Sequence, residues 1–159
     1  MGLTLTNRGT INNSGGGKII NQGNIDNQGG LINNQNGYIE SDNGTIDNSS
    51  GGLINNQGGI ITNLFGIIYN TDRGLINNTN GTIDNTDGGL INNQDGTIDN
   101  QNGGIIYNID LGTIDNQNGG SIDNNGGTIY LGFSGSVCGV GTITGTAPLG
   151  NPVSNSCPP

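Results

Sequence analysis

Few side chains in this sequence are suited to catalysis. The 159 residues include 12 acids, three bases and no histidine, and Glu40 is the one glutamate. A nucleophilic serine or cysteine needs an adjacent base, and acid–base catalysis needs paired groups with different proton affinities. No such pairing is visible in the sequence. We therefore expect that the protein is not an enzyme.

The aspartates raise the question of a metal site. Six of them directly follow the repeating isoleucine, namely Asp26, Asp47, Asp84, Asp99, Asp115 and Asp123. Calcium requires six to eight convergent oxygen ligands, whereas single carboxylates on separate repeats are typical of a solvated surface. The glycine- and aspartate-rich nonapeptide of calcium-binding repeats is absent. We expect no cofactor, with calcium binding as the less favoured alternative.

Two cysteines stand near the end of the sequence. Cys138 and Cys157 enclose 18 residues, and a disulfide closing such a loop would stabilise the fold by about 3 kcal/mol on a loop-entropy estimate. A disulfide would indicate an extracellular or cell-surface location. Two free thiols are the alternative.

The charge excludes some partners. The net charge is −9, and the only bases are Arg8, Lys18 and Arg73. These three do not make the basic stripe that a nucleic acid requires, so we expect no nucleic-acid partner. No apolar run reaches 18 residues, which predicts no membrane span. The opening MGLTLTNRGT lacks the features of a signal peptide, so the route of export stays open.

A short repeat occupies most of the chain. Units such as GTIDNQNGG and GLINNQGG place an isoleucine every six to eight residues and an asparagine two places later. Only Ser41 and Leu131 replace that asparagine. The predicted core is Ile32, Ile39, Ile46, Ile54, Ile61, Ile68, Ile76, Ile83, Ile91, Ile98, Ile106, Ile114, Ile122 and Ile129. The matching asparagines are Asn34, Asn48, Asn56, Asn63, Asn70, Asn78, Asn85, Asn93, Asn100, Asn108, Asn116 and Asn124.

This repeat predicts an all-β solenoid. Asparagine, glycine and isoleucine form helices poorly, and residues two apart on a strand share a face, so each isoleucine and its asparagine point the same way. Glycine and asparagine supply the corners between strands. A unit of seven or eight residues cannot bury its isoleucine alone, so successive coils must stack. Inward asparagines about 4.8 Å apart would then hydrogen-bond to one another in a ladder.

The number of faces per turn follows from the aspartates. Two faces and about 15 residues per turn would stack Asp84, Asp99 and Asp115, which repel one another. Three faces and about 22 residues separate them, and give the columns Asn33, Asn55, Asn77, Asp99 and Glu40, Thr62, Asp84, Tyr107. We favour three faces. The two-face winding remains the alternative.

These G-x-I-x-N units resemble the short coils of secreted β-solenoid proteins, the parallel β-helices of filamentous adhesins and extracellular fibres. The resemblance covers roughly residues 3 to 131 and is compositional. It implies a structural role outside the cell or at its surface.

We predict a solenoid domain over residues 1–131 and a non-repeat segment over residues 132–159, which forms a cap, a last coil or a strand donated to another subunit. No capping segment precedes the first unit, which suggests head-to-tail stacking of copies into an extracellular filament.

Outward aliphatic residues predict a lateral interface: Leu31, Leu53 and Leu75 in one column, Ile60 and Ile105 in a second, Ile67 and Leu90 in a third. Tyr38, Tyr69, Tyr107 and Tyr130 also point outward.

The alternative function is a surface-binding solenoid, an ice-binding or polysaccharide-binding adhesin module. In the two-face winding, one column would hold Thr82, Thr97, Thr113 and Thr128.

Overall fold

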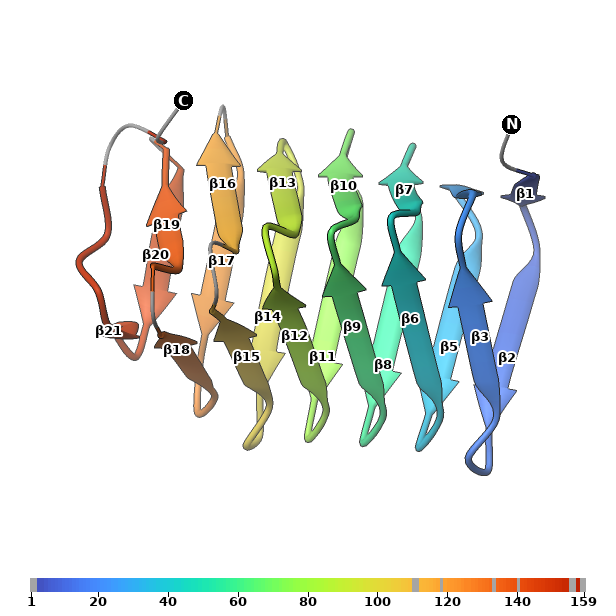
Figure 1. The fold of residues 1–159 in the computed structure, drawn as a ribbon, viewed down its shortest axis with the longest axis horizontal. Helices are drawn as coiled ribbons and strands as arrows, with labels where there is room; N and C mark the ends of the chain where they lie inside the picture. The colour runs from blue at the N-terminus through green and yellow to red at the C-terminus, as the bar shows by residue number, and fades with distance from the viewer. Residues whose placement is uncertain are drawn as a thin grey trace.

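The chain winds into a column of seven stacked coils with three strands in each (Figure 1). The computed structural model describes residues 3–109, 112–117, 119–132, 134–139, 141–154 and 157. Within them the chain forms strands of two to five residues, and each strand pairs in parallel with the third strand after it. The strands therefore make three parallel sheets, here named A, B and C, along the sides of the column.

Each coil contributes one strand to each sheet. Sheet A contains β1 (Thr4–Asn7), β4 (Asn24–Gln28), β7 (Thr45–Ser49), β10 (Ile67–Thr71), β13 (Leu90–Gln94), β16 (Thr113–Gln117) and β19 (Ser136–Cys138). Sheet B contains β2 (Thr10–Ser14), β5 (Leu31–Gln35), β8 (Leu53–Gln57), β11 (Leu75–Thr79), β14 (Thr97–Gln101), β17 (Ser121–Asn124) and β20 (Thr142–Gly145). Sheet C contains β3 (Lys18–Asn21), β6 (Tyr38–Asp42), β9 (Ile60–Leu64), β12 (Thr82–Thr86), β15 (Ile105–Asn108), β18 (Thr128–Leu131) and β21 (Leu149–Gly150).

The pairing register confirms the three-face prediction. Ile32 pairs with Ile54 and Ile54 with Ile76, 22 residues apart at each step. Both predicted outward columns are present, one running from Asn33 to Asp99 and the other from Glu40 to Tyr107. The two-face alternative is therefore wrong, and Asp84, Asp99 and Asp115 lie on sheets C, B and A respectively.

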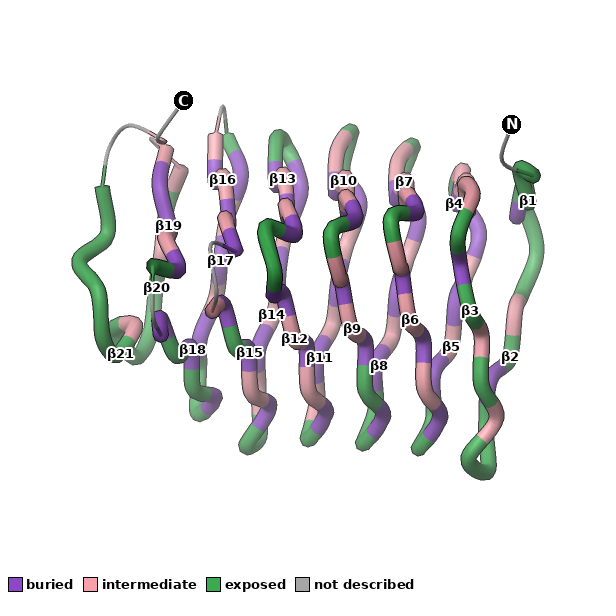
Figure 2. The backbone as a smooth tube through the Cα atoms, in the orientation of Figure 1, coloured by how far each residue is buried: buried purple, intermediate pink, exposed green. Residues whose placement is uncertain are grey.

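Burial alternates along the strands (Figure 2). In β5 to β8, for example, the isoleucine and the residue two places later are buried while their neighbours are at least partly exposed. All fourteen isoleucines named above are buried, and Ile25 and Val137 extend the core at either end. Burying an isoleucine contributes roughly 1.5–3 kcal/mol. Because the covering atoms come from the coils above and below, that contribution depends on stacking.

Asparagine ladders connect the coils inside the column. In sheet A, Asn27 donates from Nδ2 to Oδ1 of Asn48 at 2.7 Å, and Asn48 donates in turn to Asn70 at 2.8 Å. The same Nδ2 groups also donate to backbone carbonyls at the corners, such as Gly30 and Gly52. The described residues contain five such Asn–Asn bonds in sheet A, five in sheet B and two in sheet C.

The ladder of sheet C is interrupted at the two positions where the sequence departs from asparagine. Ser41 is fully buried and accepts from Asn21 at 3.3 Å, but its hydroxyl does not bond to Asn63, whose buried Oδ1 has no hydrogen-bond partner. Leu131 occupies an inward position beside Asn108 and is 2% exposed. There, Nδ2 of Asn108 bonds instead to the carbonyls of Gly112 and Ser136.

The corner glycines lie against the ladder. A Cβ on Gly59 would fall 2.8 Å from Oδ1 of Asn56 and 2.9 Å from the carbonyl oxygen of Asn34, closer than real Cβ contacts. The repeat therefore needs glycine here for close approach of the backbone to two stacked amides. Gly9 is the first-coil corner that corresponds to Gly30 and Gly52 on sheet B, and there no atom lies within 4 Å of such a Cβ.

The segment after residue 131 forms the last coil. β19, β20 and β21 pair in parallel with β16, β17 and β18. The solenoid thus continues beyond the expected boundary at residue 131. Of the cap, last coil and donated strand considered for this segment, β19 to β21 form a last coil. At the ladder positions this coil has Gly145 and Gly150, opposite Asn124 and Leu131, and Gly139 beside Asn116, all three with positive φ. The side-chain ladder therefore ends before the last coil.

We predict that Ser41→Asn stabilises the protein. The new amide would donate to Oδ1 of Asn63 and restore the interrupted ladder, which should raise the free energy of unfolding by about 1 kcal/mol. Asn56→Ser creates the same interruption in sheet B and should lower the free energy of unfolding by about 1–3 kcal/mol. Urea denaturation followed by circular dichroism measures both, and an unchanged or lowered stability of Ser41→Asn would contradict this account of the ladder.

A second prediction compares two corner glycines. Gly59→Ala should destabilise the fold by about 1–3 kcal/mol, because its methyl group overpacks against the amides of two coils. Gly9→Ala, whose methyl group enters open space, should change the unfolding free energy by less than about 0.5 kcal/mol. Equal effects of the two substitutions on the denaturation midpoint would show that the ladder does not set the corner geometry.

Candidate interaction surfaces

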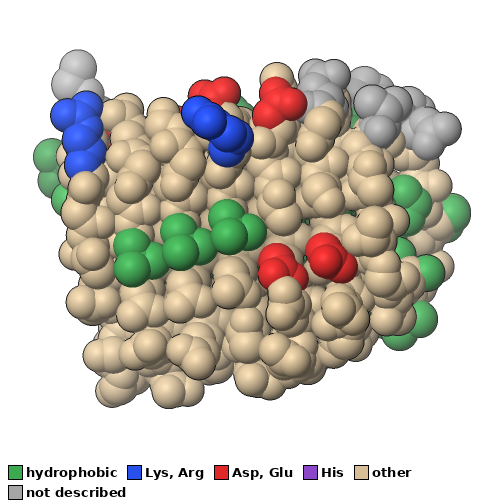
Figure 3. Space-filling view, turned by 180° about the vertical axis from the view of Figure 1, so that it is seen from behind, with side chains coloured by type: hydrophobic (Ala, Val, Ile, Leu, Met, Phe, Trp, Pro, Cys, Tyr) green, Lys and Arg blue, Asp and Glu red, His purple; other side chains and the backbone are tan. Residues whose placement is uncertain are grey.

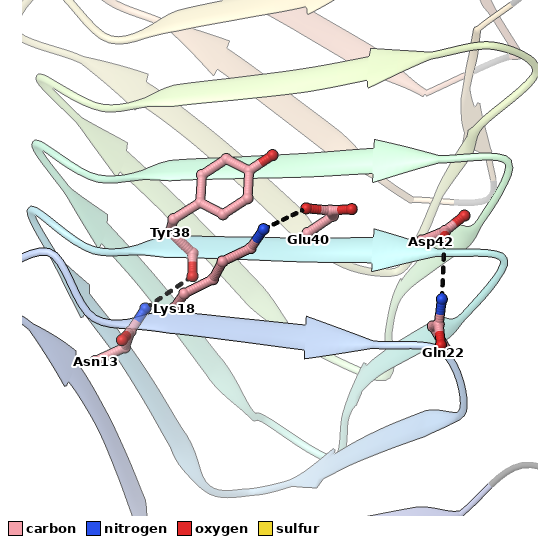
Figure 4. A network of polar contacts seen from close by, with 6 residues as sticks. All are labelled: Asn13, Lys18, Gln22, Tyr38, Glu40 and Asp42. Atoms are coloured by element: carbon pink, nitrogen blue, oxygen red, sulfur yellow. Dashed lines mark hydrogen bonds and ion pairs between the residues drawn. The ribbon is translucent and has the colours of Figure 1, made fainter.

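The single glutamate belongs to a polar cluster on the first two coils of sheet C (Figure 4). Nζ of Lys18 lies 3.1 Å from a carboxylate oxygen of Glu40 and 5.0 Å from the centroid of the Tyr38 ring. Half of the Lys18 side chain is exposed. Lys18 and Glu40 lie on neighbouring strands of an outer face. Their geometry is that of a surface ion pair, which contributes little to stability.

The six repeat aspartates are spread over all three sheets. Asp26 and Asp47 are neighbours on sheet A, and Asp99 and Asp123 are neighbours on sheet B. Glutamine side chains two residues further along bond to three of them: Gln28 to Asp26, Gln101 to Asp99 and Gln117 to Asp115. Each of these carboxylates is thus held by its own strand. Their geometry does not converge on a common point.

One group of possible metal ligands occurs in the described residues. It comprises Asp115, Cys138 and Cys157, whose ligand atoms lie within 4.8 Å of one another. However, Cys138 and Cys157, which are 19 residues apart in the sequence, form a disulfide. Sulfur in a disulfide is not the thiolate that binds metals. The predicted disulfide is therefore present, and this group does not fit a metal ion.

The predicted aliphatic columns form on the sheets, but they differ in exposure. Leu31, Leu53 and Leu75 stack directly on sheet B, where Figure 3 shows one short hydrophobic row on an otherwise polar face. All three are half-buried. Ile67 and Leu90 are neighbours on sheet A, whereas Thr82 separates Ile60 from Ile105 on sheet C. Whether any of these columns contacts a partner stays a prediction.

Sheet C carries the most exposed apolar side chains. The exposed side chains on its strands are Ile20, Ile60, Tyr107, Tyr130 and Leu149. Among the described strands of sheets A and B, Leu5 in β1 is the one large apolar residue that is exposed. The rings of Tyr107 and Tyr130 pack edge to face with centroids 6.2 Å apart. The sequence pattern alone did not single out Ile20 or Leu149. Because Ile20 follows the core residue Ile19, the three-face register places it on this face. Leu149 lies in β21, where the repeat signal is lost.

Phe65 adds to this surface at the corner after β9. It is 58% exposed and has a φ of 52°, a left-handed conformation that is unusual for a bulky residue. Asn43 and Asp87 hold the same conformation at the equivalent corners of the adjacent coils. A polar residue would therefore fit the backbone better, and the aromatic side chain there is not explained by packing within the chain.

The threonines do not form the column that ice binding would need. Thr82 and Thr128 lie on sheet C with Ile105 between them, Thr97 lies on sheet B, and Thr113 lies on sheet A. The expected column depended on the two-face winding. The structure overturns it.

Charge is distributed unequally between the walls and the ends of the column. All 12 acids lie between Asp26 and Asp123 in the sequence, and those among the described residues lie in coils 2 to 6. The first coil contains only Arg8 and Lys18 as charged side chains, and no charged side chain follows Asp123. The net charge of −9 is thus carried by the walls. The two ends are free of acids.

No protein-family model matches the sequence, and no curated protein matches it. Among solved structures, a distant match is the crystal structure of a TibC-catalyzed hyper-glycosylated TibA55-350 fragment. It is 24% identical and covers 87% of this chain with a TM-score of 0.30. The match covers 55% of that fragment, so this chain spans about half of its length. At this TM-score the likeness supports no functional argument.

The described part of the chain also contains no helix long and apolar enough to cross a membrane.

Proposed function

We propose that this protein is a non-catalytic structural subunit that stacks end to end into an extracellular or cell-surface filament. The observation that carries the proposal is the absence of acids from both ends of a column whose walls carry a net negative charge. Like charges on the walls repel neighbouring columns, whereas two ends approach each other without that repulsion. Association along the axis is therefore favoured over association side by side.

The ends also have complementary surfaces. In the first coil Leu5 occupies a core position of sheet A but is 52% exposed, and within the described residues no strand pairs with the outer edges of β1, β2 and β3. In the last coil Ile143 is only partly buried although it packs against the core. A second copy stacked in parallel would cover these side chains and pair the free edges. The joint would repeat the contacts that hold successive coils together.

Such a joint would lack one of those contacts. The last coil has glycine at its ladder positions, so the asparagine ladder cannot cross from one copy to the next. Backbone pairing and apolar burial would hold the joint alone. We therefore expect filaments to dissociate into folded columns before the columns unfold.

The disulfide supports the proposed location. Cys138 is 1% exposed and bonded to Cys157, and disulfides persist in oxidising compartments outside the cytosol. Enzymatic activity forms no part of the proposal, because the carboxylates of the repeat are held on separate strands.

A second candidate function is a surface-binding module, with sheet C as the binding face. It is favoured by the exposed apolar and aromatic residues on that sheet and by the unusual conformation of Phe65. Exposed aromatic residues that are not explained by internal packing are typical of interaction surfaces. A polysaccharide is one partner of this kind.

Two matched substitutions in the first coil separate the candidates. Leu5 and Ile20 are exposed to similar extents, but Leu5 faces the end of the column and Ile20 faces outward from sheet C. Leu5→Asn should weaken end-to-end association by about 10- to 100-fold, because about 1.5–3 kcal/mol of apolar burial is lost at each joint. Ile20→Asn should leave association unchanged. Sedimentation velocity and electron microscopy of concentrated protein provide the measurements.

Ionic strength provides a further readout in the same experiment. Salt at about 1 M shortens the range of electrostatic repulsion to about 3 Å, so lateral bundling should appear there, whereas single filaments should already form at low salt. Monodisperse short particles at every concentration and ionic strength would rule out the filament. Loss of assembly in Ile20→Asn with assembly retained in Leu5→Asn would instead assign the interface to sheet C.

A further inference from the structure

We propose that the outer edge of β19 is the docking edge for β1 of a second copy, and that residues 151–154 are a competing strand held on that edge by the disulfide. The inference rests on the end-to-end stacking proposed above and identifies the site that would control it.

The tail after β21 folds back over the last strand of sheet A. N–H of Ser154 donates to the carbonyl of Val137 at 3.0 Å, and Ser154 forms a parallel bridge with Cys138. Asn151 bonds through its backbone N–H to Leu131 and through Nδ2 to Gly135. The edge of β19 is therefore occupied, while most of β20 and all of β21 are exposed.

The position of the tail corresponds to that of β1 in the next copy. Along sheet A, the column of outward residues runs from Thr6 through Asp26 to Asp115 and Cys138, and Ser154 continues it. The residue before it, Val153, therefore adjoins the core column that begins with Leu5 and ends with Val137. The tail sequence PVS thus takes the places that TLT of β1 would take. An aliphatic residue occupies the core position in both.

The tail is held on the edge of β19 more weakly than β1 is held on β4. Val153 remains 45% exposed, and within the described residues 151–154 only Ser154 forms a bridge. By contrast, β1 pairs with β4 over four residues and joins the asparagine ladder through Asn7. Its hold on the edge is strengthened by the bond between Cys138 and Cys157, because a tether raises the local concentration of a strand at its site. The disulfide therefore biases the competition toward the tail.

A hollow beside the tail could receive the incoming residues. It has a volume of about 320 Å³ and is lined by Ile143, Ala147, Pro148 and Val153, among others. None of its lining residues is charged. The exposed side chains of Leu3 and Leu5 in a second copy are apolar and match this lining. When the tail leaves, Val153 leaves with it and the hollow widens toward β19.

The test uses the full chain with the disulfide intact or absent. Cys157→Ser should lower the protein concentration at which filaments form by about tenfold, since the competing strand loses its tether. A reducing agent should have the same effect on the unsubstituted protein and none on the Cys138→Ser/Cys157→Ser variant. Ser154→Pro, which removes the donor to Val137 but keeps the disulfide, should act in the same direction. Light scattering and electron microscopy detect the filaments, and circular dichroism confirms that each variant is folded.

Hydrogen exchange at Ser154 separates the two proposals. Its amide should be protected in the oxidised protein and exchange faster in Cys157→Ser. If Cys157→Ser and the unsubstituted protein assemble at the same concentration, the tail does not compete and this inference is wrong, while end-to-end stacking stands. If no variant assembles although Ser154 has lost its protection, the stacking proposal fails as well.

Discussion

The asparagine amides that point into the column are the constraint on which the structure depends. A buried amide without partners costs about 1–3 kcal/mol, and most coils bury three of them. Most of them are satisfied by the amide of the next coil and by backbone carbonyls at the corner, as Asn34 shows with Asn56, Gly37 and Ile60. A coil is therefore complete only between two others of the same register. Isoleucine burial adds the favourable energy, but the amides enforce the register.

This constraint explains the form of the repeat. Glycine precedes every strand from β2 to β20. Inside the column the backbone there approaches two stacked amides closely, as at Gly59. The outward positions are free of the constraint, and they vary between leucine, threonine, aspartate and tyrosine. Function and solubility thus reside in the outward residues, while the inward ones repeat. The interruption at Ser41 shows what happens when an inward residue changes: the acceptor of Asn63 loses its donor.

Much of this fold could be predicted from the sequence because the period of the repeat and the chemistry of its inward residues agree. The positions of Ile54 and Asn56 follow from alternation along one strand. The separation of Asp84, Asp99 and Asp115 favoured the three-face winding but did not decide it, because that winding also places Asp99 beside Asp123. The end of the column could not be predicted in the same way. β19 to β21 lack asparagine at the ladder positions, so the repeat signal disappears at Leu131 although the winding continues. Of the exposed face on sheet C, Ile60, Tyr107 and Tyr130 were predicted to point outward. Ile20 and Phe65 were not, because their exposure depends on which neighbours cover them.

The direction of the ladder gives the column an electrical polarity. Every Asn–Asn bond named above donates from Nδ2 of one coil to Oδ1 of the next, so the amide dipoles point the same way along the axis. A peptide-like amide carries about 3.5 D, and aligned amides sum as they do in a helix, whereas sheets themselves have only small net dipoles. The oxygen ends face the first coil, which is therefore the negative pole. Arg8 and Lys18, two of the three cationic side chains, lie at that pole and offset its field.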